Sequence, residues 1–365
     1  MRVVMISKAC VVGQYQTKLE ELAKLGEMEL TVVVPPVWRD ERGSLPLERV
    51  HTQGYTLRAE PIRFNGQFHW HYYPTLANIL RQLRPHVVHI DEEPYNLATF
   101  LALRAAQAIH AKTLFFAWQN LSRRYPPPFA WLEQFVLRRA DYAIVGNADA
   151  ETVIRAKGYR GPACVIPQFG VDPDTFAPRP RQPAAAFRIG YLGRLVAEKG
   201  VDGLLRAAAT LRGEWQLDVI GSGPAQASLA QLANELGIAP RVHFAAWRPS
   251  GEMPAVYSQL DALVVPSRTR PNWKEQFGRV LIEAMACAVP VIGSDCGEIP
   301  NVIGDAGLVF PENDIAALGA HLAALQNDPT QRAALGARGR ARVLARFTQK
   351  RVAEATYRVY CALIN

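Results

Sequence analysis

Two glutamates, Glu275 and Glu283, stand eight positions apart around Gly278 in the segment KEQFGRVLIEAMA. The apolar pattern over residues 282–286 indicates a helix, which places Glu283 in that helix and Glu275 in the loop before it. Free N–H groups at a helix N-terminus bind anions such as a diphosphate. Carboxylates would repel this anion, but they accept hydrogen bonds from pairs of sugar hydroxyls. The segment therefore predicts a site for a sugar nucleotide.

Basic residues follow a predicted strand earlier in the same half of the chain. Gly193 and Arg194 come directly after the apolar run 187–192, and Lys199 stands five positions after Arg194. An arginine and a lysine at the carboxyl end of a strand can hold a diphosphate through charge-assisted hydrogen bonds. Taken alone, the segment fits an exposed arginine and lysine equally well.

A glycine-rich turn follows the next predicted strand, in the segment LDVIGSGP, which contains Gly221 and Gly223. Glycines let the backbone approach a ligand closely, and they also form tight turns between a strand and a helix. This segment alone supports both interpretations.

The bulk composition is that of a globular protein. The chain has 365 residues, of which 49% are hydrophobic and 20% charged, and its formal net charge is +8. The length suits two domains, and the basic balance favours an anionic substrate or an anionic membrane surface. The densest basic stretch, 337–347, fits the exposed face of a helix, so we expect no nucleic acid partner.

The cysteines and the N-terminus point to the cytoplasm. Five scattered cysteines without metal-ligand spacing predict reduced thiols. The N-terminal run MRVVMIS is too short for the core of a signal peptide. No window reaches the ~18 apolar residues that a membrane span requires. We therefore expect a cytoplasmic protein, with peripheral contact at the inner face of the membrane as an option.

Strand and helix patterns alternate along the chain, which predicts an α/β protein with parallel sheets covered by helices on both faces. Strands are expected at 2–6, 30–34, 87–90, 113–117, 142–145, 187–192, 216–220, 242–245, 262–266, 289–293 and 307–310. Helices are expected at 16–25, 75–83, 97–109, 128–139, 201–210, 224–236, 253–260, 279–286 and 314–326.

The alternation is interrupted once, by a segment rich in proline and alanine. We predict an N-terminal doubly wound domain over 1–170, a linker over 171–186 and a second doubly wound domain over 187–348. In such sheets ligands lie at the carboxyl ends of the strands, and two facing domains form a cleft.

Four motifs in series resemble the family-4 glycosyltransferases of the GT-B fold, which consist of two Rossmann-like domains facing across a cleft. The motifs are IGYLGRLVAEKG (189–200), LDVIGSGP (217–224), LDALVVPSR (260–268) and the Glu-x7-Glu segment. Their order and spacing match across most of the chain. The resemblance implies a retaining sugar transferase, and it implies that the final helix, 349–365, crosses back onto the first domain.

The resemblance also implies roles in the domain that binds the donor. Arg194 and Lys199 would contact the donor diphosphate, Glu283 the ribose, and Glu275 would lie near the transferred sugar and act with both basic residues in catalysis. The remaining donor-binding positions are Gly193, Gly221, Gly223, Trp247, Arg248, Gln276, Phe277 and Gly278.

The first domain departs from the family pattern in two loops. The family often has a Gly-Gly pair in the first loop, where this chain has Gly13 alone. The family commonly has a His-Asp after the strand that here ends in LFFA, where this chain has Trp118, Gln119 and Asn120. These residues are candidates for contact with the acceptor, by stacking on a sugar face or by hydrogen bonding to a hydroxyl.

Two further segments have open interpretations. In HIDEEPYN, Asp91 and Glu92 suit a hydroxylated or cationic acceptor, or they belong to a solvated loop, whereas His89 is expected to be buried in its strand. The segment RRYPPPFAWLEQFVLRRA (123–140) mixes arginine with aromatic residues. It fits either peripheral docking on an anionic membrane or an ordinary amphipathic helix.

We therefore expect a retaining, metal-independent glycosyltransferase without a cofactor, which uses a UDP- or GDP-sugar. The acceptor would be a hydroxyl of a glycan, a lipid-linked sugar or a small molecule, as in the assembly of cell-envelope polysaccharides. Two alternatives are a GT-B sugar-nucleotide epimerase and a non-enzymatic protein that binds a sugar nucleotide. The missing His and Gly-Gly motivate the second alternative.

Overall fold

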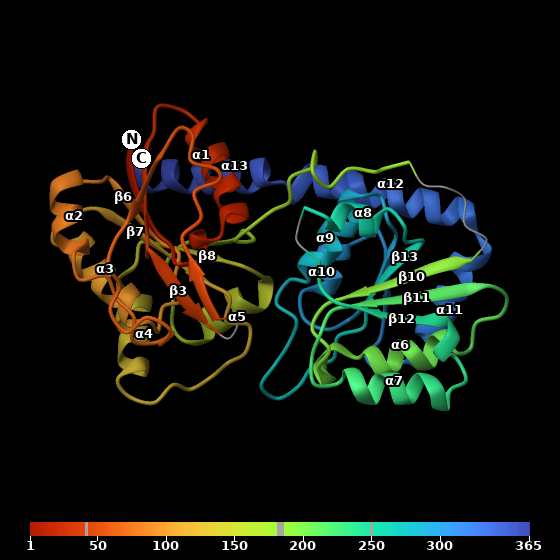
Figure 1. Cartoon of the computed structure of the whole chain (residues 1–365). Coiled ribbons are helices and arrows are strands. Elements are labelled where there is room, and N and C mark those ends of the chain that lie inside the picture. The colour runs from red at the N-terminus through yellow and green to blue at the C-terminus, as the bar shows by residue number, and fades with distance from the viewer. Residues whose placement is uncertain (41–42, 181–185, 249–250) are drawn as a thin grey trace. The chain divides into compact units, whose positions relative to one another are not determined.

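The computed structural model describes residues 1–40, 43–180, 186–248 and 251–365 (Figure 1). The chain divides into two compact units. Unit 1 comprises Met1–Gly170 and Gln349–Asn365, and unit 2 comprises Val171–Thr348.

Unit 1 is built on a seven-stranded sheet in the order β5-β2-β1-β6-β7-β8-β9, in which all neighbouring strands are parallel. Its strands are β1 (Arg2–Ile6), β2 (Glu29–Val34), β5 (Thr56–Ala59), β6 (Val87–Ile90), β7 (Lys112–Ala117), β8 (Tyr142–Val145) and β9 (Ala163–Val165). An antiparallel hairpin consists of β3 (Val37–Asp40) and β4 (Gly43–Pro46).

Helices cover both faces of this sheet. They are α1 (Thr17–Ala23), α2 (Leu76–Leu83), α3 (Leu97–Gln107), α4 (Phe129–Arg139), α5 (Ala148–Ala156) and α13 (Gln349–Ile364). Strand β1 alternates between the two faces: Val4 packs with the core that includes α2 and α3, and Met5 with the core that includes α1 and α13. The C-terminal helix α13 packs against α1, so the last residues of the chain complete the core of the first unit (Figure 1).

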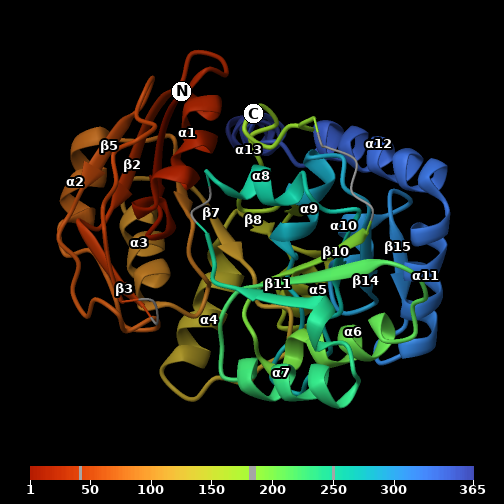
Figure 2. The ribbon, with the colours of Figure 1, turned by 45° about the vertical axis from the view of Figure 1, so that its right-hand side comes forward.

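Unit 2 has a six-stranded parallel sheet in the order β12-β11-β10-β13-β14-β15. Its strands are β10 (Phe187–Leu192), β11 (Trp215–Ile220), β12 (Val242–Ala245), β13 (Ala262–Val265), β14 (Val291–Ser294) and β15 (Leu308–Phe310). Its helices are α6 (Val201–Ala208), α7 (Gln226–Glu235), α8 (Met253–Tyr257), α9 (Arg279–Ala286), α10 (Ile299–Ile303), α11 (Ile315–Asn327) and α12 (Pro329–Arg346). Helices α6 and α7 lie on one face of β10 and β11, and α8 and α9 lie on the other (Figure 2).

The predicted α/β class and the predicted strands of both units are confirmed, with boundaries that move by one or two residues. The sequence patterns missed β5, β9, the β3–β4 hairpin, α5 and α10, which are short or weakly periodic. The segment predicted as a linker is partly core, because Val171 and Phe176 are buried in unit 2. Residues 181–185 of that segment lie outside the described residues.

The loops after β10 and β11 approach each other so closely that glycine is required. Gly221 has φ 149°, and a Cβ atom there would lie 1.9 Å from the carbonyl oxygen of Gly193. Next to this contact, Leu195 donates its N–H to the Ser222 carbonyl at 2.8 Å. The packing of the two loops therefore accounts for Gly221, independently of any ligand.

We predict that Gly221→Ala lowers the free energy of unfolding by at least about 3 kcal/mol, because the backbone of both loops must shift. Urea unfolding measures this change. The matched control is Gly237→Ala, where φ is 70° but a Cβ would meet no atom within 4 Å. The free energy of unfolding of this control should fall by only about 1 kcal/mol, because alanine is strained in the left-handed region. Equal losses in the two variants would show that the loop contact is not the constraint.

Candidate functional site

A cavity of about 260 Å³ in unit 2 lies at the carboxyl end of β10 and in front of α9. The structure brings six of the predicted donor-site residues together around it: Gly193, Arg194, Lys199, Glu275, Gln276 and Gly278. Trp273, Lys274 and Arg279 complete much of the polar lining. Segments more than 70 positions apart thus converge on one cavity.

Lys199 and Glu275 form an ion pair in the wall of this cavity. The Lys199 Nζ lies 2.6 Å from the Glu275 Oε2, which also accepts a hydrogen bond from the Ser267 hydroxyl at 3.0 Å. Glu275 is only 8% exposed, and the Lys199 ammonium lies 4.7 Å from the ring centroid of Trp273. Because an ammonium carries three N–H donors, the bond to Glu275 leaves capacity to bind an anion.

The N-terminus of α9 opens onto the same cavity. Gly278 is the N-cap residue, with φ 73°, and the helix begins at Arg279. Arg279 and Val280, in the first turn, line the cavity. The N–H groups of a first helical turn and the positive end of the helix dipole favour an anion there. Arg194, Lys199 and Arg279 add three cationic side chains around this position.

Glu283 lies one turn further along α9 and is 6% exposed. Its Oε2 accepts a hydrogen bond from the Tyr257 hydroxyl at 2.7 Å, and its Oε1 lies 2.8 Å from the Nε of Arg279. Burial raises the pKa of Glu283, and Arg279 opposes that shift. Each carboxylate oxygen has two lone pairs, so both retain capacity for a further donor such as a hydroxyl.

Six predicted donor-binding residues do not line this cavity: Gly221, Gly223, Trp247, Arg248, Phe277 and Glu283. The ring of Phe277 is partly buried and packs against the core of unit 2, with its centroid 5.8 Å from that of Phe347. A donor-binding role of the Phe277 backbone stays a prediction. Trp247 is 49% exposed. Arg248 lines a second cavity of about 260 Å³ in unit 2. A donor-binding role of Trp247 and Arg248 stays a prediction.

Sequence reasoning missed four residues in or next to this site. Trp273 and Arg279 line the cavity, Ser267 bonds to Glu275, and Tyr257 bonds to Glu283. For two of them the sequence contains a signal that could have identified the residue. Arg279 and Glu283 are four positions apart on one helix, the spacing at which side chains pair. Ser267 follows the buried strand β13, and polar residues at the carboxyl end of a parallel strand are candidates for a site.

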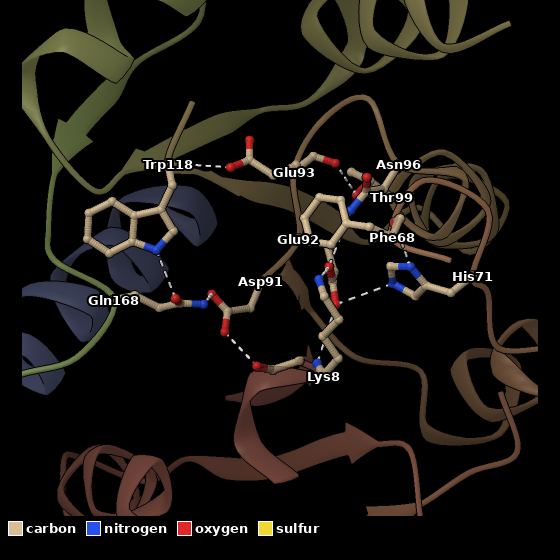
Figure 3. Close-up of polar contacts among 11 residues, drawn as sticks. Lys8, Phe68, His71, Asp91, Glu92, Glu93, Asn96, Thr99, Trp118 and Gln168 are labelled. Carbon is tan, nitrogen blue, oxygen red and sulfur yellow. Dashed lines mark hydrogen bonds and ion pairs between the residues drawn. The ribbon is translucent and has the colours of Figure 1, made fainter. Parts of the chain in front are cut away.

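In unit 1, a hydrogen-bonded cluster lies at the carboxyl ends of β1, β6 and β7 (Figure 3). Asp91 accepts hydrogen bonds from the Ser7 hydroxyl at 2.6 Å and from the Gln168 side-chain amide at 2.9 Å. The Trp118 indole N–H in turn donates to the Gln168 Oε1 at 2.9 Å. This chain of bonds fixes the orientation of the Trp118 ring.

Asp91, Glu92 and Glu93 are 3%, 2% and 8% exposed, so the interpretation of this segment as a solvated loop is wrong. Burial opposes ionisation of Glu92, but Lys8 and His71 outweigh it and lower the pKa of Glu92 to about 2. Glu93 accepts the backbone N–H of Trp118 at 2.8 Å, and burial raises the pKa of Glu93 to about 7 despite this bond.

The other acceptor-side candidates also bond within unit 1. The Gln119 side chain donates to the Leu121 carbonyl at 2.6 Å and accepts from the Tyr125 hydroxyl at 3.0 Å. Asn120 is 7% exposed. Gly13 donates its N–H to the Glu48 carboxylate at 2.5 Å. Any role of Gly13, Gln119 or Asn120 toward an acceptor stays a prediction.

The remaining sequence expectations concern single residues and helix α4. His89 is buried as expected, with its Nδ1 2.7 Å from the Tyr360 hydroxyl. The five cysteines are free thiols.

On α4, within the segment considered for membrane contact, Trp131 is 58% exposed, while Leu132 and Val136 are buried. Membrane contact through residues 123–140 stays a prediction.

Within the described ranges, no helix is long and apolar enough to cross a membrane. The same part of the chain contains no group of three His, Cys, Asp or Glu side chains arranged to hold a metal ion. Asp172 and Asp174 have the Asp-x-Asp spacing of a candidate pair of metal ligands. In this structure Asp172 accepts the backbone N–H of Asp174 at 3.1 Å and so closes a turn.

Both units match known protein families. Residues 175–342 match the model of glycosyl transferases group 1, and residues 14–168 match the glycosyl transferase 4-like domain. Among solved structures, a sucrose-phosphate synthase from Thermosynechococcus elongatus aligns with a TM-score of 0.74 at 21% identity, covering 100% of this chain and 99% of its own. Anabaena HepE in complex with UDP aligns with a TM-score of 0.77 at 17% identity, covering 100% of both chains.

Curated relatives are similar over part of their length. A GDP-mannose-dependent α-(1-6)-phosphatidylinositol monomannoside mannosyltransferase of Mycolicibacterium smegmatis is 34% identical over 235 residues, which are 58% of this chain and 61% of the relative. A D-inositol 3-phosphate glycosyltransferase of Corynebacterium jeikeium is 34% identical over 62% of this chain and 59% of the relative. The matched region thus spans about three-fifths of each relative.

The two doubly wound units and the cavity at the strand ends define a protein of the GT-B class. Because the two family models together cover most of both units, the chain belongs to the family-4 glycosyltransferases.

The pKa of Glu93 predicts a stability change with pH. A carboxyl whose folded pKa is about 7, above its usual value of 4.5, stabilises the fold while it is protonated, and this stability is lost as the pH rises from about 4.5 through 7. Glu93→Gln keeps an acceptor for the Trp118 N–H but cannot ionise. We predict that the unfolding free energy of Glu93→Gln, relative to wild type, rises by about 3 kcal/mol between pH 4.5 and pH 8.

Urea unfolding at several pH values measures this difference, and Glu235→Gln, which removes an exposed carboxylate on α7, is the control. The difference between Glu235→Gln and wild type should stay constant from pH 5 to pH 8. A constant difference for Glu93→Gln as well would contradict the raised pKa.

Proposed function

We propose that this protein transfers a glycosyl group from a nucleoside-diphosphate sugar to a hydroxyl group of an acceptor. The observation that carries the proposal is the convergence of Arg194, Lys199 and the α9 N-terminus on one cavity, with Glu275 in its wall. An anion site beside a fixed carboxylate suits a ligand that joins a diphosphate to a polyol.

The proposed donor is a UDP- or GDP-sugar. The similar mannosyltransferase is named as GDP-mannose-dependent, and the HepE structure contains UDP. In the proposed arrangement the diphosphate lies at the α9 N-terminus, Glu283 accepts from the ribose hydroxyls, and Glu275 lies near the transferred sugar. Unit 1 would bind the acceptor, with Trp118 in the place where the family commonly has a histidine.

The proposed reaction retains the configuration of the transferred sugar. The bond between the anomeric carbon and the diphosphate oxygen breaks, and the acceptor oxygen bonds to the same face of that carbon. The acceptor proton passes to the departing diphosphate oxygen. Arg194, Lys199 and the first N–H groups of α9 stabilise the negative charge that grows on the diphosphate. These cationic groups supply the role that a metal ion would otherwise have.

Incubation with a panel of UDP-, GDP- and ADP-sugars, with and without hydroxyl acceptors, separates this proposal from its two alternatives. An epimerase would consume the donor without an acceptor. A binding protein would have a higher melting temperature in the presence of the nucleotide but would convert no donor. Glycosylated product that forms only when an acceptor is present supports the transferase.

We predict that Glu275→Ala and Lys199→Ala each lower kcat at least about 100-fold, because each removes a charge that acts on the transition state and breaks the ion pair in the cavity wall. Initial rates of product formation measure this loss. The control is Glu235→Ala, which removes an exposed carboxylate on α7 and should keep the wild-type rate. Unchanged transfer by Glu275→Ala would rule out the mechanism.

We also predict that an excess of EDTA leaves the transfer rate within about twofold of the untreated enzyme, since cationic side chains and helix N–H groups neutralise the diphosphate. The same assay in Mg²⁺ should give the same rate. Loss of activity in EDTA that Mg²⁺ restores would contradict metal independence.

A further inference from the structure

The outer face of helix α4 in unit 1 carries aromatic rings where a surface helix usually carries polar side chains. Trp131, Phe135 and Arg138 follow the spacing i, i+4, i+7, so they lie on one side of the helix. Trp131 is 58% exposed, Phe135 is half-buried and Arg138 is exposed. Leu132 and Val136, on the other side, are buried in the core. Helix α4 is therefore amphipathic, with an outer face that mixes tryptophan and arginine.

Helix α3 lies beside α4 and extends this face (Figure 1). The ring centroid of Trp131 lies 5.2 Å from that of Phe100 on α3 and 5.8 Å from that of Phe135. An arginine stacks on each phenylalanine: the guanidinium carbon of Arg104 lies 5.8 Å from the Phe100 centroid, and that of Arg139 lies 4.3 Å from the Phe135 centroid. We call this surface the aromatic–arginine face, which consists of Phe100, Arg104, Trp131, Phe135, Arg138 and Arg139.

The charges that α3 and α4 expose are all positive. Helix α3 contains no aspartate or glutamate, and the one acidic residue of α4 is Glu133. Glu133 is only 6% exposed and lies 2.6 Å from the Lys157 ammonium, so it does not neutralise the outer face. Arg104, Arg138 and Arg139 are exposed.

The chain around this face adds to the positive charge. The loop that leads into α4 contributes Arg123 and Arg124, which are both exposed. The sequence from 94 to 132 contains no aspartate or glutamate. A basic surface of this kind attracts a polyanion over distances up to the Debye length.

The combination of rings and arginines favours an anionic bilayer over other partners. Indole rings are suited to the headgroup region, where one part of the ring meets apolar chains and the N–H meets water. Arginine reaches the lipid phosphates with two parallel N–H groups while its stem packs on apolar surface. A second copy of this chain on the same face would bring like charges together, which costs free energy.

We propose that the aromatic–arginine face docks unit 1 on the surface of an anionic lipid bilayer. Trp131 enters the headgroup region, and Arg104, Arg138 and Arg139 bond to lipid phosphates. This contact lies at the membrane surface and needs no helix that crosses it. The proposal does not rest on sugar transfer, so it is tested without a donor.

Binding of the full chain is measured by co-sedimentation with vesicles of phosphatidylcholine, either pure or with about one-third phosphatidylglycerol. The anionic vesicles should bind wild type at least about 30-fold more tightly, because each arginine near such a surface contributes about fivefold. Raised salt should weaken this binding.

Two pairs of matched variants separate the face from the rest of the molecule. Trp131→Ala should weaken binding to anionic vesicles at least about fivefold, whereas Trp247→Ala, which removes an exposed tryptophan of unit 2, should leave it unchanged. Arg138→Gln with Arg139→Gln should weaken it at least about 10-fold. Arg338→Gln with Arg346→Gln, which removes the same charge from exposed positions of α12, should change it less than about twofold.

Tryptophan fluorescence reports the contact itself and does not depend on a destabilised variant. Brominated lipids should quench part of the wild-type emission, and Trp131→Phe, which keeps an aromatic ring, should bind but lose most of this quenching. Equal binding to neutral and anionic vesicles, unchanged binding by the Arg138 and Arg139 double variant, or undiminished quenching in Trp131→Phe would overturn the proposal. Tighter binding to polyglutamate or to single-stranded RNA than to anionic vesicles would assign the face to another polyanion and would also overturn it.

Discussion

The ion pair between Lys199 and Glu275 is the interaction on which the cavity in front of α9 depends. It joins residues 76 positions apart, in the loop after β10 and in the loop before α9. Both side chains are largely buried, and a buried charge without a partner is costly. The pair therefore fixes both loops together, and with them the positions of Arg194 and of the α9 N-terminus. The close approach of Gly193 and Gly221 restrains the first of these loops from its other side.

In unit 1, loops are also held together by buried charged and polar side chains. Lys8 is paired with Glu92, and Asp91 is held by Ser7 and Gln168, all near the carboxyl ends of parallel strands. In both units the buried carboxylates hold loops in place, and the paired lysine, Lys199 or Lys8, lines a cavity. Trp118 is held at both its backbone and its ring, which gives a fixed aromatic surface where the family commonly has a histidine.

Sequence patterns predicted the alternating strands, the helix α9 and the grouping of Glu275 with Arg194 and Lys199, because these depend on local periodicity and on motifs of fixed spacing. The patterns could not show which polar residues are bonded within the protein. Asp91 to Glu93 have the composition of a solvated loop but are buried, since Lys8 and Ser7 reach them from another strand. The Phe277 ring lies within a donor motif and packs against the core of unit 2, a contact that depends on the distant Phe347.

A crystal structure with bound UDP or GDP tests the donor site most directly. The account predicts that the diphosphate lies at the N-terminus of α9, with oxygens about 3 Å from Arg194, Lys199 and the first backbone N–H groups of the helix. It also predicts that the ribose hydroxyls donate to Glu283. A nucleotide bound in unit 1, or bound in unit 2 with its diphosphate away from Lys199 and α9, would contradict the account.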